Sequence, residues 1–199
     1  MYNFDFLAGV YNQDQLMMNH YSVHLNLLTQ TMDAASTNVA LERVKCFVQR
    51  DMQHTVFFGV GDHDKAEMFH VMGTNVTTLP EEPVDQIIGI MLYCKLNAIM
   101  EDRMVVTSLD VSSTLGESVW YSHDDDDNLG PFADDSDKSW WYTTSPQHHC
   151  IELESNADNV VKVIPNVWHE YGLKWPEEEI DNSEDNTVIY PNFQRNETK

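Results

Sequence analysis

Basic side chains are scarce in this sequence. Its 199 residues include 11 Lys and Arg against 33 Asp and Glu, which gives a formal net charge of −22 at pH 7. A field of this sign repels phosphate and excludes direct binding to nucleic acid or to an anionic membrane surface. The charge favours a basic protein as partner, and it leaves the cofactor unknown, with a divalent cation as an open candidate.

Cysteine and long apolar runs are scarce as well. The three cysteines, Cys46, Cys94 and Cys150, cannot all pair within the chain and have no CxxC spacing, so we expect reduced thiols. The longest apolar stretch, residues 87–93, is too short to span a bilayer. The first ten residues contain no Lys or Arg, whereas a secretory signal begins with basic residues. These features predict a soluble, cytoplasmic protein with no membrane segment.

Aromatic residues, in contrast, are plentiful. Phe, Trp and Tyr make up 11% of the chain, which is well above the aromatic content typical of an acidic disordered protein. The composition changes after residue 176, where the run EEEIDNSEDN has too few apolar side chains to form a core. We therefore predict one α+β domain over residues 1–176 and an acidic tail over residues 177–199 whose composition favours mobility.

Three segments have the apolar spacing of helices. The first covers residues 12–33, and its apolar side chains recur at helical intervals, at Met17, Tyr21, Leu25, Leu28 and Met32. The second covers residues 38–52, with Ser36, Thr37 or Asn38 as the N-cap. The third covers residues 83–100 after a T-x-x-E start signal at Thr78. It is apolar enough to be the central core helix, in which Gly89 would let a neighbouring element approach closely.

The remaining apolar segments have the character of strands. They are residues 54–60 and 67–73 as one hairpin, 104–113 and 117–123 as another, and then 138–144, 150–153 and 159–165. The fold class that follows is α+β. About three helices in the N-terminal half pack on a mostly antiparallel sheet, which is formed largely by the C-terminal half.

The strongest concentration of charge lies in the predicted loop 123–137. It contains Asp124, Asp125, Asp126, Asp127, Asp134 and Asp135. An EF-hand alignment fails, because Leu129 occupies the position of the turn glycine. We predict that these carboxylates bind the basic partner, with Trp140 and Trp141 beside them as aromatic anchors. The alternatives are a cation site in the same loop and a loop that is only solvated.

Histidines offer a second set of candidates. His20 and His24 are four residues apart and would share one face of the predicted first helix, where they could bind a metal ion together. His63 and Asp64 would complete the site if the fold brought them near. The alternative is that His24 is a packed core residue and His20 is exposed to solvent.

Motifs for nucleophilic catalysis or nucleotide binding are absent. Ser112 and Ser113 have no nucleophile elbow around them, and neither a P-loop nor G-x-G-x-x-G occurs. The sequence therefore favours a non-enzymatic acidic binding or regulatory protein that engages a basic surface of a protein partner. That partner could itself be a nucleic-acid-binding protein. The alternatives are a metal-dependent hydrolase with a His/Asp site, and a structural or assembly subunit that forms homo-oligomers.

Overall fold

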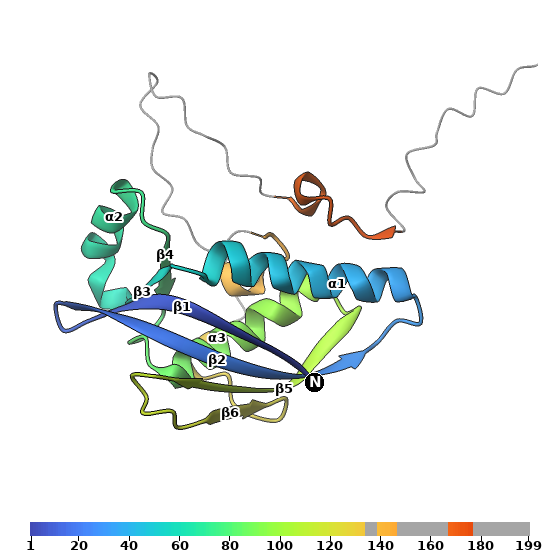
Figure 1. Ribbon diagram of the computed structural model, residues 1–199, viewed down its shortest axis with the longest axis horizontal. Coiled ribbons are helices and arrows are strands. Elements are labelled where there is room, and N and C mark those ends of the chain that lie inside the picture. The colour runs from blue at the N-terminus through green and yellow to red at the C-terminus, as the bar shows by residue number, and fades with distance from the viewer. Residues whose placement is uncertain (134–138, 147–166, 177–199) are drawn as a thin grey trace, which may run out of the picture.

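The computed structural model describes residues 1–133, 139–146 and 167–176. Its strands are β1 (Tyr2–Asn12), β2 (Gln15–Thr29), β3 (Val56–Gly59), β4 (Val76–Leu79), β5 (Met104–Ser113) and β6 (Tyr121–Asp124). Its α-helices are α1 (Ala34–Phe47), α2 (His63–Val71) and α3 (Asp85–Met100). Figure 1 shows α1 and α3 over one face of the sheet, with residues 167–176 on the outer side of α1.

The six strands form one mixed sheet in the order β4-β3-β1-β2-β5-β6. β1 pairs with β3, and β3 with β4, in parallel, whereas the β1–β2, β2–β5 and β5–β6 pairs are antiparallel. The molecule is α+β, but the predicted arrangement is wrong. The N-terminal strands are central in the sheet, and the helices lie in the middle of the chain.

The helix predicted over residues 12–33 is a strand, β2. Its buried residues are every second one: Asn19, Tyr21, Val23 and Leu25. Residues four apart, such as Tyr21 and Leu25, share a face in a strand as well as in a helix, so their spacing could not distinguish the two structures. Pairing with β1 on one side and β5 on the other decided the outcome.

A tight turn makes the β1–β2 hairpin possible. Gln13 and Asp14 both have positive φ, at 48° and 59°, as a two-residue type I′ turn requires. Neither residue is glycine, so the sequence carries no strong turn signal at this point. The hairpin register pairs Tyr2 with Leu25 and Asn12 with Gln15.

The second predicted helix is confirmed, with different ends. α1 begins after Asp33, whose carboxylate accepts hydrogen bonds from the backbone N–H groups of Ala35 (3.1 Å) and Ser36 (2.8 Å). This N-cap replaces those predicted at residues 36–38. The helix continues into a single π-helical segment, Val48–Met52.

The predicted hairpin over residues 54–60 and 67–73 is half right. Its first strand is β3, but the second segment belongs to helix α2. Phe69 of α2 packs edge-on against Phe58 and Tyr11, with ring centroids 5.4 and 6.2 Å apart. This small cluster covers the sheet face opposite α1 and α3, and α2 connects the parallel strands β3 and β4.

α3 is the central core helix, as predicted. Residues from Ile87 to Met100 are mostly buried along it. A Cβ atom on Gly89 would lie 2.9 Å from Val111 Cγ1 and 3.1 Å from Tyr121 Cδ1, which confirms that this glycine permits close contact with the sheet. The T-x-x-E signal is not used, because Thr78 lies in β4 and the N-cap is Val84.

The later strand predictions have mixed outcomes. β5 agrees with the prediction, but β6 begins at Tyr121 because Glu117 and Ser118 adopt positive φ values of 54° and 59° in a turn. Trp140–Tyr142 is a 3-10 helix and not part of a strand. The strands predicted over residues 150–153 and 159–165, and the tail 177–199, lie outside the described residues. No helix in the described part of the chain has the length and apolar character needed to cross a membrane.

Candidate functional site

A pocket opens at one end of the main core. In Figure 1 the β1–β2 turn, the N-terminal end of α3 and the β5–β6 loop meet at the left end of the sheet. The pocket between them has a volume of about 410 Å³, at the lower end of the range typical of ligand sites. Its lining residues are Val10, Asn12, Met17, Asn19, Pro83, Val84, Asp85, Gln86, Leu115, Gly116, Val119 and Tyr121.

Asp85 is the acidic residue of this pocket, and the fold holds it in place. It is the first residue of α3, and both of its carboxylate oxygens lie 2.8 Å from Ser113 Oγ at the end of β5. Ser113 Oγ in turn accepts a hydrogen bond from Gly116 N–H at 3.0 Å. A Cβ atom on Gly116 would lie only 2.3 Å from Asp85 Oδ2, so a larger residue there would force this carboxylate to move.

No Lys or Arg in the described part of the chain neutralises the charge of Asp85. Within residues 1–133, 139–146 and 167–176, no Lys or Arg forms an ion pair with it. Burial raises the pKa of its carboxyl above the usual value, and the hydrogen bond from Ser113 acts in the opposite direction. A carboxylate has about four acceptor positions, so the single hydroxyl leaves capacity for a ligand.

Two buried polar groups lie beside Asp85. Asn19 is 2% exposed, and its Oδ1 accepts a hydrogen bond from Leu115 N–H at 3.0 Å. The Tyr21 side chain is fully buried and is not among the lining residues of the pocket. Burial raises the pKa of its hydroxyl, a hydrogen bond with the Asn19 side chain opposes that shift, and the charge of Asp85 adds to it.

The rim of the pocket is apolar. Four large apolar side chains of the lining are exposed: Met17, Val84, Leu115 and Val119 are between 36% and 68% exposed. The pocket therefore combines an anionic floor with an apolar entrance. That combination fits a ligand with a cationic end and an aliphatic stem.

Nucleophilic catalysis does not fit this arrangement. Ser113 is 3% exposed, and its hydroxyl is occupied by Asp85 and Gly116. No histidine of the described residues lines the pocket to act as a base. The Asp85 carboxylate remains as a hydrogen-bond acceptor for a ligand.

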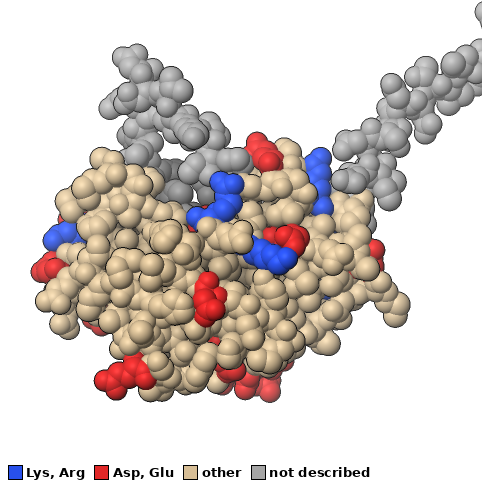
Figure 2. All heavy atoms as spheres, in the orientation of Figure 1, with Lys and Arg blue, Asp and Glu red and all other residues tan. Residues whose placement is uncertain are grey.

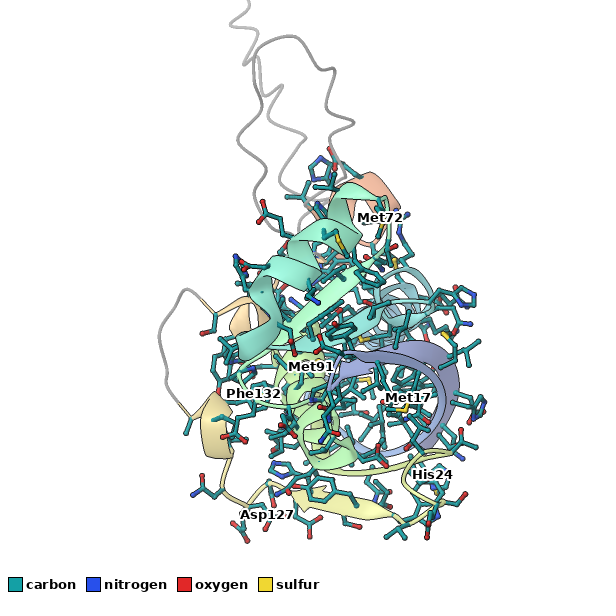
Figure 3. The ribbon with its side chains drawn as sticks, turned by 90° about the vertical axis from the view of Figure 1, so that its left-hand side faces the viewer. Met17, His24, Met72, Met91, Asp127 and Phe132 are labelled. Carbon is teal, nitrogen blue, oxygen red and sulfur yellow. The ribbon has the colours of Figure 1, made fainter. Side chains whose placement is uncertain are left out.

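The predicted acidic loop lies elsewhere. Asp124, Asp125, Asp126 and Asp127 are exposed at the far end of β6, and Figure 3 shows Asp127 well apart from Met17 of the pocket. In Figure 2 the lower edge of the molecule carries acidic side chains and no basic ones. These residues are accessible to a partner, and their role in binding stays a prediction. Asp134 and Asp135 lie outside the described residues.

A buried histidine adjoins this acidic loop. His123 is fully buried, its Nδ1 is 4.0 Å from Asp127 Oδ2, and its ring packs edge-on against Tyr93 with centroids 4.6 Å apart. Burial lowers the pKa of His123, and Asp127 and Asp124 oppose that shift.

The predicted aromatic anchors are part of the core. Trp140 is 8% exposed and donates a hydrogen bond from Nε1 to the Thr78 carbonyl at 3.3 Å. Trp141 is half-buried and packs against Phe132, with ring centroids 5.1 Å apart. The segment is a 3-10 helix and not the predicted strand, and both rings pack against the core. A partner-binding role for either one stays untested.

The predicted metal ligands do not converge among the described residues. His20 and His24 lie on strand β2, where residues four apart are separated by about 13 Å along the strand. His20 is exposed, and His24 stacks on Trp120 with ring centroids 4.4 Å apart. His63 and Asp64 begin α2 and are exposed. The described part of the chain has no group of three or more His, Cys, Asp or Glu able to hold a metal ion.

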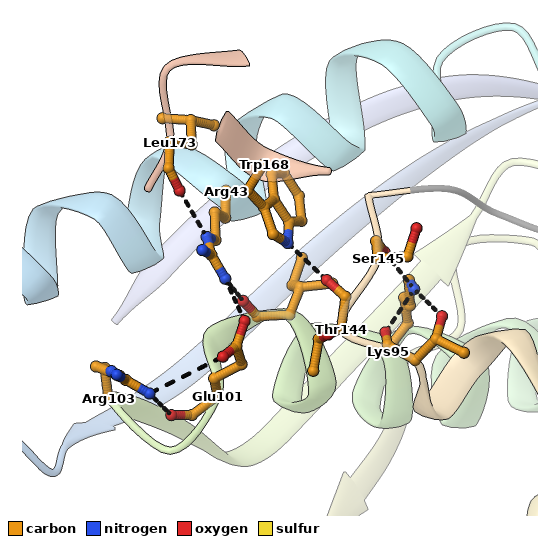
Figure 4. Close-up of polar contacts among 10 residues, drawn as sticks. Arg43, Lys95, Glu101, Arg103, Thr144, Ser145, Trp168 and Leu173 are labelled. Carbon is orange, nitrogen blue, oxygen red and sulfur yellow. Dashed lines mark hydrogen bonds and ion pairs between the residues drawn. The ribbon is translucent and has the colours of Figure 1, made fainter. Parts of the chain in front are cut away.

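The buried cations have internal partners, in contrast to Asp85. Arg43 Nη1 is 2.5 Å from Glu101 Oε1, and its guanidinium lies over the rings of Trp175 (3.8 Å) and Trp168 (4.9 Å). Lys95 Nζ is within 3.1 Å of Thr143 Oγ1 and of three backbone carbonyls, those of Trp140, Thr143 and Ser145. Figure 4 shows how these contacts hold residues 139–146 and 167–176 against α1 and α3.

Sequence reasoning missed the pocket almost entirely. Ser113 was noted as a serine without a base, but nothing in the sequence connects it to Asp85, 28 residues earlier. The available signal was an aspartate at the start of the most apolar helix, which reads as ordinary helix capping. The incorrect helix prediction for residues 12–33 also prevented Asn19 and Tyr21 from being recognised as neighbours of Asp85.

Comparison with known proteins gives little further information. No family model matches this chain, and a search of curated proteins finds no match. A solved structure of a catalytic-residue variant of Plasmodium vivax 6-pyruvoyltetrahydropterin synthase superposes with a TM-score of 0.37 at 14% identity, covering 61% of this chain and 90% of that one. A score of this size does not establish a shared fold, and we draw nothing about function from it.

Proposed function

We propose that this protein is a non-enzymatic binding protein that engages a basic surface of a protein partner, with the Asp85 pocket as the point of contact. The observation that supports this most directly is the half-buried Asp85 carboxylate, which has one hydroxyl as its described partner and lies inside an apolar rim. The net charge of −22 would steer a basic partner toward the molecule. The apolar rim would then contact the aliphatic parts of the same partner.

A labelled cationic peptide tests the proposal. We would measure fluorescence anisotropy of a short fluorescein-labelled peptide that alternates basic and leucine residues. The wild-type protein should bind it in a salt-sensitive manner, and Asp85→Asn should weaken binding by roughly tenfold, which is about 1.4 kcal/mol.

The chain offers a matched control. Asp110 lies on the same strand as Ser113 and accepts a hydrogen bond from Ser122 Oγ at 2.5 Å, but it faces away from the pocket. Asp110→Asn therefore removes one charge from a similar Asp–Ser pair and should leave affinity nearly unchanged. If the Asp124–Asp127 quadruple Asn variant loses binding and Asp85→Asn does not, the contact is at the acidic loop and the pocket assignment is wrong.

Exposed apolar side chains on the surface also support a second candidate, a subunit that assembles with copies of itself. Met18, Val119 and Trp120 are 56%, 68% and 45% exposed, and a homo-oligomeric interface could bury them. Sedimentation velocity over a wide concentration range tests this candidate. A strict monomer at high concentration would exclude it.

A further inference from the structure

We propose that His123 is a pH-sensitive latch for one wall of the Asp85 pocket. The neutral ring anchors strand β6 in the core, and the protonated ring leaves the core and releases the strand. This inference rests on the proposed function and adds its regulation, because a partner bound at the pocket would dissociate on acidification. Three observations carry it: the burial of His123, a ring nitrogen with no partner among the described residues, and the place of Tyr121 in the pocket wall.

Strand β6 depends on His123 for its attachment to the core. It is an edge strand of four residues, and in the described part of the chain it pairs with β5 alone. His123 is the one buried residue of these four, and its ring packs edge-on against Tyr93 of α3. Its neighbour on β5 is the apolar Leu109. The ring that holds the strand is therefore one that can change its charge.

The surroundings of the His123 ring suit its neutral form. Nδ1 lies 3.4 Å from the Tyr121 hydroxyl, and Nε2 is buried with no hydrogen-bond partner among the described residues. In the neutral ring, Nε2 can stay unprotonated as an acceptor that lacks a donor. Protonation places an N–H group on both nitrogens, so Nε2 would become a buried donor on a charged ring, with no described acceptor. That arrangement costs more free energy than the neutral one.

The protonated ring has partners outside the core. The exposed carboxylates of Asp124 and Asp127 follow His123 directly, and Asp127 Oδ2 is 4.0 Å from Nδ1. Burial lowers the pKa of His123 below its ordinary value of 6.5, and these two carboxylates oppose that shift. The other titratable groups at the ring are the hydroxyls of Tyr93 on α3 and Tyr121 on β6, whose pKa values are raised by burial, so both are neutral in acid. Acid therefore favours a ring that turns outward to the carboxylates.

Tyr121 connects this latch to the pocket. It lines the pocket and lies two residues before His123, on the same face of β6. Its ring contacts α3, where a Cβ atom on Gly89 would lie 3.1 Å from Tyr121 Cδ1. When β6 leaves the core, this wall of the pocket leaves with it. The attachment is complete above pH 6.5 and is lost as the pH falls through the lowered pKa of His123.

Hydrogen exchange of the backbone amides in residues 121–124 tests the latch in the full chain. Protection factors are compared at pH 7.5 and pH 5.5, after correction for the intrinsic rate of exchange. In the wild type, we expect the protection of β6 to fall by roughly tenfold on acidification. Protection of β1 should not change, because the release is local to the edge of the sheet.

Two substitutions at His123 show whether this ring is the cause. His123→Phe keeps a buried ring and removes the titrating group, so the loss of protection at pH 5.5 should disappear. His123→Gln is uncharged at both pH values and serves the same purpose if phenylalanine impairs folding. His20→Gln is the matched control, because His20 is exposed on β2, and it should behave as the wild type.

The outcomes separate the latch from the proposed function. Equal protection at both pH values would overturn the latch, and so would an equal fall in the wild type and His123→Phe. Affinity for the labelled cationic peptide at pH 5.5 tests the link to the pocket, because titration of Asp85 affects both proteins alike. Tighter binding by His123→Phe than by the wild type supports the regulation, and equal affinity overturns it. If β6 opens in acid but the peptide binds at neither pH, the proposed function fails and the latch stands.

Discussion

The two ends of α3 handle charge in opposite ways. Toward its C-terminal end, Lys95 and the Arg43–Glu101 pair are buried and surrounded by partners from segments far away in the sequence. At its N-terminal end, Asp85 is half-buried with one described hydroxyl partner. Charges of the first kind maintain the fold, because their partners are all internal. A charge of the second kind keeps acceptor positions for a ligand, and the proposed function places the ligand at that end.

The largest loss of stability should come from removing the buried cation Arg43, which is paired near the C-terminal end of α3. Arg43→Met should destabilise the protein by about 3 to 5 kcal/mol, because Glu101 and the carbonyls of Ile99 and Leu173 would lose a buried donor. Urea unfolding followed by tryptophan fluorescence measures this. Lys45→Met, which removes an exposed cation paired with Glu42, is the control and should leave stability nearly unchanged, because solvent screens this pair. Similar values for the two variants would contradict the comparison.

Lys95→Met should have a smaller effect of about 2 kcal/mol, because the carbonyls of Trp140, Thr143 and Ser145 lose their donor while the cost of burying a cation disappears. Hydrogen exchange should also show earlier opening of residues 139–146. Unchanged exchange in this segment would show that Lys95 does not hold it.

The same lysine predicts a dependence on pH. Burial lowers its pKa to about 7 from the ordinary 10.5, so between these values the unfolded chain binds a proton that the folded chain does not. Stability should therefore rise with pH from 7 to 8.5, by up to about 1.4 kcal/mol per pH unit. The rise should be absent in Lys95→Met. A flat profile in the wild type would mean that the four surrounding oxygens keep the ammonium charged.

Gly89→Ala tests the close contact between α3 and the sheet. The added Cβ would lie 2.9 Å from Val111 Cγ1, and overpacking of this kind costs about 1 to 3 kcal/mol, partly offset by the better helix propensity of alanine. A net loss of about 1 kcal/mol is expected in thermal unfolding. Gly61→Ala is the matched control, because a Cβ at that position meets nothing within 4 Å.

Asp85→Asn should have the smallest effect on stability, and it tests the difference between the two ends of α3 most directly. Asparagine can still accept the Ser113 hydrogen bond, and it removes an uncompensated charge, so we expect no loss and a gain of at most about 1 kcal/mol. The same variant should lose affinity for the labelled cationic peptide. A loss of stability comparable to that of Arg43→Met would indicate that Asp85 serves the fold and would count against a binding role.

Parts of the fold could be read from sequence because their signals are local. The apolar composition of residues 83–100 predicted the core helix, and Gly89 was correctly interpreted as a point of close approach. β5 and α1 were recognised from their own periodicity. In these segments, local preference and tertiary environment agree.

Other parts could not be predicted, for reasons that are equally physical. Tyr21 and Leu25 fit a helix and a strand equally well, and only hydrogen bonding to β1 and β5 selects the strand. That error placed His20 and His24 on a helix face that does not exist. It also concealed Asn19 and Tyr21 as neighbours of the pocket.

The sequence by itself determined the net charge, the presence of one strongly apolar helix and the α+β class, because these follow from composition and local periodicity. The tertiary structure decided which acidic residue lies in a pocket. The chain has 33 acidic side chains, and the local sequence around Asp85 does not distinguish it from the others. It differs from them only because the end of β5, the turn at Gly116 and the start of α3 come together around it. Contacts between residues distant in the chain depend on chain closure and packing, which local sequence does not encode.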